Sequence, residues 1–186
     1  MTMQKISLHD SLIAGLARND RGSAAVEFAI IVPIMLVLFF GVIEFSSGVA
    51  VDRKVTLVAR TLSDLTSRST CVTQTDLDGF AITGKAIMSP YSTTPLLSTV
   101  TEVYIDENLD AKVQWSKGSA PKSGTVSSIP PGLKIKDTYL ILADVEYLYT
   151  PVGIGYVMKA NINLKDSTYT RPRQSKSVTY KASSCA

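Results

Sequence analysis

The chain has 186 residues, with 19 lysines and arginines against 16 aspartates and glutamates, which gives a formal net charge of +3. A balance this weak gives no reason to expect a nucleic-acid surface. The only histidine is His9, and no P-loop or HExxH string occurs, so the residue content argues against an enzyme and against a zinc site.

The first 21 residues mix charged side chains with a short amphipathic stretch and end in the charged cluster Arg18-Asn19-Asp20-Arg21. This segment is long and highly charged for the n-region of a secretory signal. It is typical of a leader that stays in the cytoplasm.

Residues 22–43, GSAAVEFAIIVPIMLVLFFGVI, form the densest apolar block. No charge occurs in residues 28–43, and the run reaches the roughly 20 residues that a bilayer-spanning helix needs. Glu27 is the exception, because a carboxylate inside an apolar helix needs a partner or a lipid headgroup. Alternatively, Glu27 lies at the membrane interface and only starts the helix, where the positive end of the helix dipole stabilises a carboxylate. Pro33 lacks a backbone donor and predicts a kink in this helix.

Beyond the apolar block, the pattern becomes periodic, with Val51, Val55, Val58, Leu62 and Leu65 at alternating spacings of four and three. One helix face therefore packs on another element. The sheet of the following domain is the favoured partner, and a neighbouring protein's helix is the alternative. The polar run of residues 67–70 ends the helix.

A second helix is predicted over residues 76–88, with Thr75 and Asp78 in the positions of a capping box. Alternating patterns then predict a hairpin of two strands, one ending at residue 105 and the other running over residues 111–115.

The turn of this hairpin has the first three ligand positions of a calcium loop in Asp106, Asn108 and Asp110. However, Ala111 replaces the turn glycine and Lys117 replaces the bidentate glutamate. A polar turn is therefore the favoured interpretation.

Residues 117–132 are rich in Ser, Gly, Pro and Lys and predict a surface loop. The alternating run 139–149 predicts a central strand covered on both faces. Asp144 and Glu146 share one face of it. Paired carboxylates can perform acid–base chemistry, but no further catalytic group accompanies them, so a solvated sheet face is favoured.

Residues 151–158, PVGIGYVM, are an apolar connection that packs in the core or near the membrane. A last strand is predicted over residues 160–169, followed by a basic tail. Cys71 and Cys185 bracket the region after the apolar helix, and in an oxidising compartment they would form a disulfide. Two free thiols or an intermolecular bridge are the alternatives.

The string from Arg21 to Phe28, RGSAAVEF, resembles the processing site of type IV prepilins and pseudopilins. The longer string RGSAAVEFAIIVPIML resembles the start of the TadE/TadG family of tight-adherence (Flp) pilus assembly proteins, and residues 145–173 resemble its C-terminal part. The resemblance implies that a prepilin peptidase cuts between Gly22 and Ser23. Glu27, Phe28 and Pro33 would then lie in a mature helix that takes part in assembly.

By this resemblance the chain is a pilin-like α+β protein, with a long N-terminal transmembrane helix packed on a mainly antiparallel β-sheet. Its expected parts are a cleaved cytoplasmic leader (1–22), a transmembrane helix (23–43), an amphipathic continuation (44–68) and a periplasmic α+β domain (69–186). It would be a minor pseudopilin of the bacterial inner membrane, without cofactor, metal, small-molecule substrate or nucleic acid. Its partners would be the prepilin peptidase, membrane lipid, the major pilin and other Tad/Flp assembly proteins.

Two other classes of function compete with this interpretation. The chain would be a generic membrane-anchored or secreted binding domain if a signal peptidase cut after residues 48–50, Gly-Val-Ala, although this cut would divide the periodic helix. A periplasmic enzyme that uses carboxylates is the third possibility, and it needs an acidic cleft.

Overall fold

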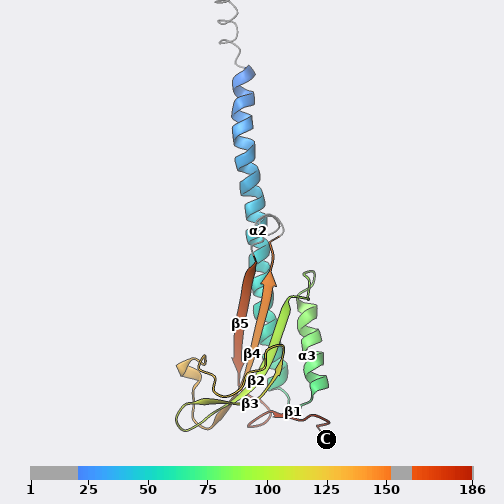
Figure 1. Cartoon of the computed structure of the whole chain (residues 1–186), viewed down its shortest axis with the longest axis vertical. Helices are drawn as coiled ribbons and strands as arrows, with labels where there is room; N and C mark the ends of the chain where they lie inside the picture. The colour runs from blue at the N-terminus through green and yellow to red at the C-terminus, as the bar shows by residue number, and fades with distance from the viewer. Residues whose placement is uncertain (1–20, 152–160, 186) are drawn as a thin grey trace, which may run out of the picture. The chain divides into compact units, whose positions relative to one another are not determined.

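The computed structural model describes residues 21–151 and 161–185. Its elements in chain order are α2 (Arg21–Ser67), β1 (Cys71–Val72), α3 (Gln74–Ile87), β2 (Leu96–Ile105), β3 (Ala111–Gly118), the short 3-10 helix η1 (Pro131–Leu133), β4 (Thr138–Tyr149), β5 (Ile162–Thr170) and β6 (Thr179–Tyr180). The protein thus combines a long apolar N-terminal helix with an antiparallel sheet, which confirms the predicted α+β class (Figure 1).

Helix α2 is described without a break from Arg21 to Ser67, and it continues through Pro33. Its segment Ala24–Ser67 contains a window with a mean hydropathy of 2.7, none of which is buried. By length and composition this helix can cross a membrane. The chain divides into two compact units, Met1–Phe45 and Ser46–Ala186, so the apolar part of α2 is described apart from the domain that follows.

The second unit is built on a four-stranded sheet with the order β3-β2-β4-β5, in which all neighbours are antiparallel. Strand β4 lies between β2 and β5, as the long alternating run predicted, and Figure 1 shows it in the middle of the sheet. Its side chains alternate between two apolar cores, one on each face of the sheet.

The first core joins α2 and α3 to one face of the sheet. Val51, Val55, Val58 and Leu62 of α2 are buried in one cluster with residues of β4 such as Ile141. This confirms that the periodic face of the helix packs on the domain's own sheet. Leu65, the last member of the predicted stripe, is only half-buried.

The second core lies on the opposite face of the sheet. Val126 and Ile129 are buried there against Leu140 and Leu142 of β4. The prediction of a plain surface loop over residues 117–132 was therefore wrong for these two side chains. Isolated apolar residues among Ser, Gly and Pro carry no periodicity, so the sequence pattern did not reveal their burial.

Helix α3 begins two residues before the predicted start. Its N-cap is Thr73, whose hydroxyl accepts the Asp76 backbone N–H, while the Asp76 carboxylate accepts the Thr73 N–H at 2.9 Å. The predicted capping pair, Thr75 and Asp78, was therefore wrong by two residues. Both pairs fit the Thr-x-x-Asp pattern of a capping box, so the sequence did not distinguish them.

The turn between β2 and β3 is a polar turn, as favoured from the sequence. The Asp106 carboxylate accepts the backbone N–H groups of Asn108 and Asp110, each at 2.9 Å, and pairs with Lys112. Both carboxylate oxygens of Asp106 are thus engaged within the turn, and a calcium ion would need them as ligands.

The predicted basic tail contains structure that the sequence pattern missed. Strand β6 pairs in parallel with β1, with Cys71 opposite Thr179 and Val72 opposite Tyr180. A disulfide joins Cys71 to Cys185, with the two Cα atoms 5.8 Å apart. Two-residue strands are too short to produce an alternating pattern.

Two predictions fall outside the described residues. They are the leader predicted over residues 1–22, of which residues 1–20 are not described, and the apolar connection predicted over residues 151–158, of which residues 152–158 are not described. The last strand of the sheet runs from Ile162 to Thr170, close to the predicted 160–169.

Candidate functional site

The predicted processing site lies in the first turn of α2. Gly22 is exposed, and a Cβ atom added there would meet no atom within 4 Å. Packing in this structure therefore does not require a glycine at position 22.

Glu27 follows Ser23 by four residues within the same helix. Residues four apart on an α-helix are neighbours on one face, with Cβ atoms about 5–6 Å apart. A positive group at Ser23, such as a new amino terminus, would therefore lie within reach of the Glu27 carboxylate. Oppositely charged partners offset the cost of taking each charge out of water.

The rest of the apolar part of α2 exposes its side chains in the described unit. Phe28 is 68% exposed, and Pro33 is also exposed. Most other apolar residues from Val26 to Phe45 are likewise exposed, on every side of the helix, and Val32 is half-buried. A helix that is apolar on all sides requires lipid or other helices around it.

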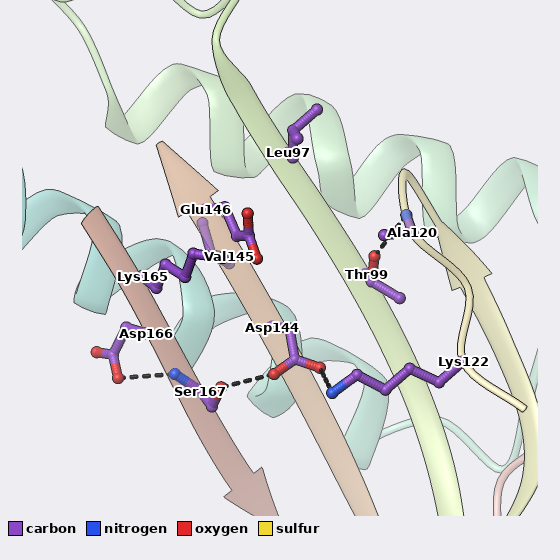
Figure 2. Close-up of a pocket in the computed structure, with 10 residues that line it drawn as sticks. All are labelled: Leu97, Thr99, Ala120, Lys122, Asp144, Val145, Glu146, Lys165, Asp166 and Ser167. Carbon is purple, nitrogen blue, oxygen red and sulfur yellow. Dashed lines mark hydrogen bonds and ion pairs between the residues drawn. The ribbon is translucent and has the colours of Figure 1, made fainter. Parts of the chain in front are cut away.

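Asp144 and Glu146 line a cavity of about 140 Å³ on the sheet face away from α2, together with Lys122 and Lys165 (Figure 2). Asp144 pairs with Lys122 at 2.6 Å and accepts the Ser167 hydroxyl at 2.6 Å, while Glu146 pairs with Lys165 at 2.7 Å. Each carboxylate thus has its own lysine. This arrangement is a set of surface ion pairs, which matches the favoured interpretation of a polar sheet face.

The sequence analysis missed a buried carboxylate, Glu102 of β2. Its side chain accepts the Val178 backbone N–H at 2.5 Å and the Trp115 indole N–H at 3.0 Å. Burial raises the pKa of Glu102 to about 7, and the hydrogen bonds from Val178 and Trp115 act in the opposite direction. One signal in the sequence could have predicted this burial. Glu102 shares one face of the β2 pattern with Val100 and Tyr104, and a carboxylate in such a position is unusual.

The resemblance noted for residues 145–173 lies outside the family match at residues 22–62, and the end of this stretch contacts the end of α2. Arg173 pairs with Asp64 at 2.9 Å, and the Arg173 backbone N–H donates to the carbonyl of Ser67, the last residue of the helix. Thr170 also meets the helix, because its hydroxyl accepts that of Ser63 at 2.7 Å. These polar contacts fix the last turns of α2 to β5 and to the segment after it.

Within residues 21–151 and 161–185, no three His, Cys, Asp or Glu side chains form a group able to hold a metal ion. The candidate sites of the described chain are therefore the start of α2, the ion pairs beside Asp144 and the buried Glu102.

Within the part of the chain that the structure describes, a long exposed apolar helix followed by an antiparallel α+β domain defines a protein with one candidate membrane anchor, which lies near the N-terminus. Residues 22–62 match the family model described as TadE-like protein, which confirms the resemblance for this helical segment. No curated protein and no solved structure matches the chain. The TadE-like segment indicates a structural component associated with the tight-adherence pilus.

Proposed function

We propose that this protein is a minor pseudopilin of a tight-adherence (Flp) pilus or of a related secretion machine. It is held in the bacterial inner membrane by a single pass of α2, with its N-terminus in the cytoplasm and its α+β domain in the periplasm. The TadE-like match over residues 22–62 is the observation that carries the proposal. The disulfide between Cys71 and Cys185 supports an oxidising compartment for the domain.

In the proposed mechanism, a prepilin peptidase removes the leader after Gly22, and Ser23 becomes the first residue of the mature helix. The new amino group then pairs with Glu27 of the same subunit or of a neighbouring one. This pairing sets the position at which the helix packs among those of the major pilin and other assembly proteins. Phe28 and Pro33 lie on the same apolar helix and contribute to this packing.

The cleavage step is tested by N-terminal sequencing of the mature protein. We expect Ser23 as the first residue, and a chain that begins at Val51 or at Met1 would contradict the proposal. Gly22→Ala should block cleavage. Gly41→Ala is a matched control, because a Cβ atom at either glycine meets nothing within 4 Å.

The assembly step is tested by counting pili on cells that carry Glu27→Ala. We expect normal amounts of the protein in the membrane and a loss of pili, because the mature amino terminus no longer has its carboxylate partner. Glu44→Ala is the control, since it removes an acidic residue from the same helix outside the processing string. Normal piliation with Glu27→Ala would contradict the assigned role.

The partners are tested by affinity purification of the tagged protein from detergent-treated membranes. Recovery of the major pilin or of other Tad/Flp assembly proteins supports the proposal. Their absence from material that contains the correctly processed protein would favour the alternative of a generic membrane-anchored binding domain.

A further inference from the structure

The segment that follows β5 contacts α2, the sheet and β1 in turn before it reaches the disulfide. We call residues 171–185 the strap. Its first half is held at the surface, where Arg173 pairs with Asp64 of α2 at 2.9 Å and Lys176 pairs with Asp137 at 2.9 Å. Exposed ion pairs of this kind contribute little to stability, so other contacts must determine where the strap lies.

The middle of the strap is fixed by one buried residue. Val178 has no exposed surface, and its side chain belongs to the same apolar core as Val72 of β1 and Leu62 of α2. Its backbone N–H donates to the Glu102 carboxylate at 2.5 Å, and its carbonyl accepts the Trp115 indole N–H at 2.7 Å. An aliphatic side chain is thus buried together with two satisfied backbone groups. The strap is docked at Val178 by contacts that involve neither cysteine.

The residues after this docked position direct the strap along β1. Thr179 lies opposite Cys71, and its backbone N–H donates to the Thr70 carbonyl at 3.1 Å. The Lys181 N–H donates to β1 in the same way, at 3.0 Å. Cys185 follows four residues later, and its Cα atom lies 5.8 Å from that of Cys71. The pairing of β6 with β1 therefore brings the two cysteines to the same place.

Docking limits how far Cys185 can move from Cys71 in a chain whose bridge is open. Without docking, 15 positions separate Cys185 from Thr170, the last residue of β5. With β6 paired to β1, only four positions follow Lys181. The probability that two points of a flexible chain meet falls with about the 3/2 power of the length between them. Docking therefore raises the effective concentration of the two thiols by roughly 10-fold.

The two cysteines differ in access. Cys185 is exposed, whereas Cys71 is half-buried. Disulfides form by attack of a thiolate on an existing disulfide, and an accessible thiolate reacts first. The Cys185 thiolate would attack one sulfur of an oxidising disulfide, releasing one thiolate of the oxidant and leaving a mixed disulfide. The Cys71 thiolate would then attack the Cys185 sulfur and release the second thiolate. The two released thiolates take up the two protons that the cysteines lose.

We propose that Glu102 and Trp115 dock the strap through Val178 before the bridge exists, and that an external disulfide then oxidises the docked strap by reaction at Cys185. Glu102 and Trp115 are thus positioning residues for this oxidation, because they act through Val178. The inference goes beyond the proposed function and does not depend on it, since the reaction requires only this chain and a disulfide oxidant.

Docking without the bridge is tested by amide hydrogen exchange on the full chain in detergent, with the double variant Cys71→Ser, Cys185→Ser. We expect the amides of Val178 and Thr179 to stay protected, because their acceptors are Glu102 and Thr70. Amides of β4 in the same sample report whether the sheet is folded. Exchange of the strap amides at the rate of an unstructured peptide would overturn the inference, with or without protection in β4, because the bridge would then be what places the strap.

The contribution of docking to oxidation is tested by equilibrating the full chain in buffers of reduced and oxidised glutathione. Alkylation of free thiols with a maleimide-linked polymer separates reduced from bridged chains on a gel, and their ratio gives the effective concentration of the two thiols. Val178→Asp places a charge at the buried position and should lower this value by roughly 10-fold. Thr179→Asp is the matched control, because it places the same charge at the neighbouring exposed position, opposite Cys71. Equal values for the two variants would overturn the role of docking.

The site of reaction is tested with oxidised glutathione and two single-cysteine variants. Intact-mass measurement follows the growth of the glutathione adduct. We expect the adduct to form several-fold faster in Cys71→Ser, which keeps Cys185, than in Cys185→Ser, which keeps Cys71. Faster reaction at Cys71 would overturn the assignment of Cys185 as the reacting residue.

Discussion

The Glu102 carboxylate in the middle of β2 accepts a hydrogen bond from the backbone N–H of Val178, with 2.5 Å between nitrogen and oxygen. The two residues lie 76 positions apart in the chain. The Trp115 indole N–H donates at 2.7 Å to the Val178 carbonyl and at 3.0 Å to Glu102, so both backbone groups of Val178 are satisfied. A buried backbone group without a partner is costly, and these hydrogen bonds remove that cost where the C-terminal segment contacts β2 and β3.

The first prediction concerns the pH dependence of stability. The pKa of Glu102 rises from its ordinary value of 4.5 to about 7 in the folded protein, mainly because the side chain is buried. The folded state thus binds the proton more tightly than the unfolded chain, so this contribution to stability is complete below about pH 4.5. It is lost as the pH rises through about 7.

Chemical unfolding of the full chain in detergent at several pH values checks this, with Glu102→Gln as the comparison. The difference in the free energy of unfolding between wild type and Glu102→Gln should change over this pH range and be constant outside it. Glu146→Gln, which removes the exposed ion pair with Lys165, is the control for the loss of one carboxylate. A flat difference for Glu102→Gln would contradict the raised pKa.

The second prediction concerns Trp115→Phe, which keeps an aromatic ring and removes the indole N–H. The Val178 carbonyl then loses its donor, and the free energy of unfolding should fall by about 1–3 kcal/mol. Far-UV circular dichroism is the suitable probe, because Trp115 is the only tryptophan in the chain. Tyr104→Phe, which removes the phenolic contact to Asp137 at the surface, should cost less than 1 kcal/mol, and equal losses for both variants would argue against the buried network.

The third prediction concerns the disulfide. Cys71 and Cys185 close a loop with a sequence separation of 114 residues. The chain-entropy model gives a stabilisation on the order of 4 kcal/mol for such a loop, and Cys185→Ser or reduction should remove most of it. Urea unfolding with and without reductant measures the loss, and the double variant Cys71→Ser, Cys185→Ser should not respond to reductant. A covalent dimer on a non-reducing gel would be inconsistent with pairing inside one chain.

The fourth prediction concerns Gly118 at the end of β3. Its φ of +134° is rare for residues with a side chain, and a Cβ atom there would lie 2.2 Å from the Ser98 carbonyl oxygen. Gly118→Ala should therefore lower the free energy of unfolding by about 2–4 kcal/mol. Gly132→Ala is the control, because open space surrounds that position and its φ is not positive. Similar midpoints of thermal unfolding for the two variants would contradict this account.

The parts of the fold that were predictable from the sequence have long and regular patterns. The stripe that contains Val51, Val55 and Leu62 identified the buried face of α2, and the alternation over residues 139–149 identified β4 as the central strand. Both patterns repeat over enough residues for periodicity to distinguish helix from strand. The family resemblance depended on the specific string of residues 21–36 rather than on periodicity, and the family match covers residues 22–62.

The parts that were not predictable depend on single residues that meet across long distances in the chain. Glu102 has the sequence environment of a strand residue, and only the arrival of Val178 and Trp115 makes it a buried hydrogen-bonded carboxylate. Strands β1 and β6 each have two residues, and no local pattern relates them. Val126 and Ile129 are likewise buried by the fold around them.

The bond between Cys71 and Cys185 also determines how the protein carries a mechanical load. Tension applied between α2 and a point beyond Cys185 travels along the helix to Cys71 and crosses the bridge directly, because the bridge is the shorter covalent path. Strands β2, β3, β4 and β5 lie inside the closed loop and do not bear that tension. For as long as the bridge is oxidised, a pull between these two points would leave the sheet without load.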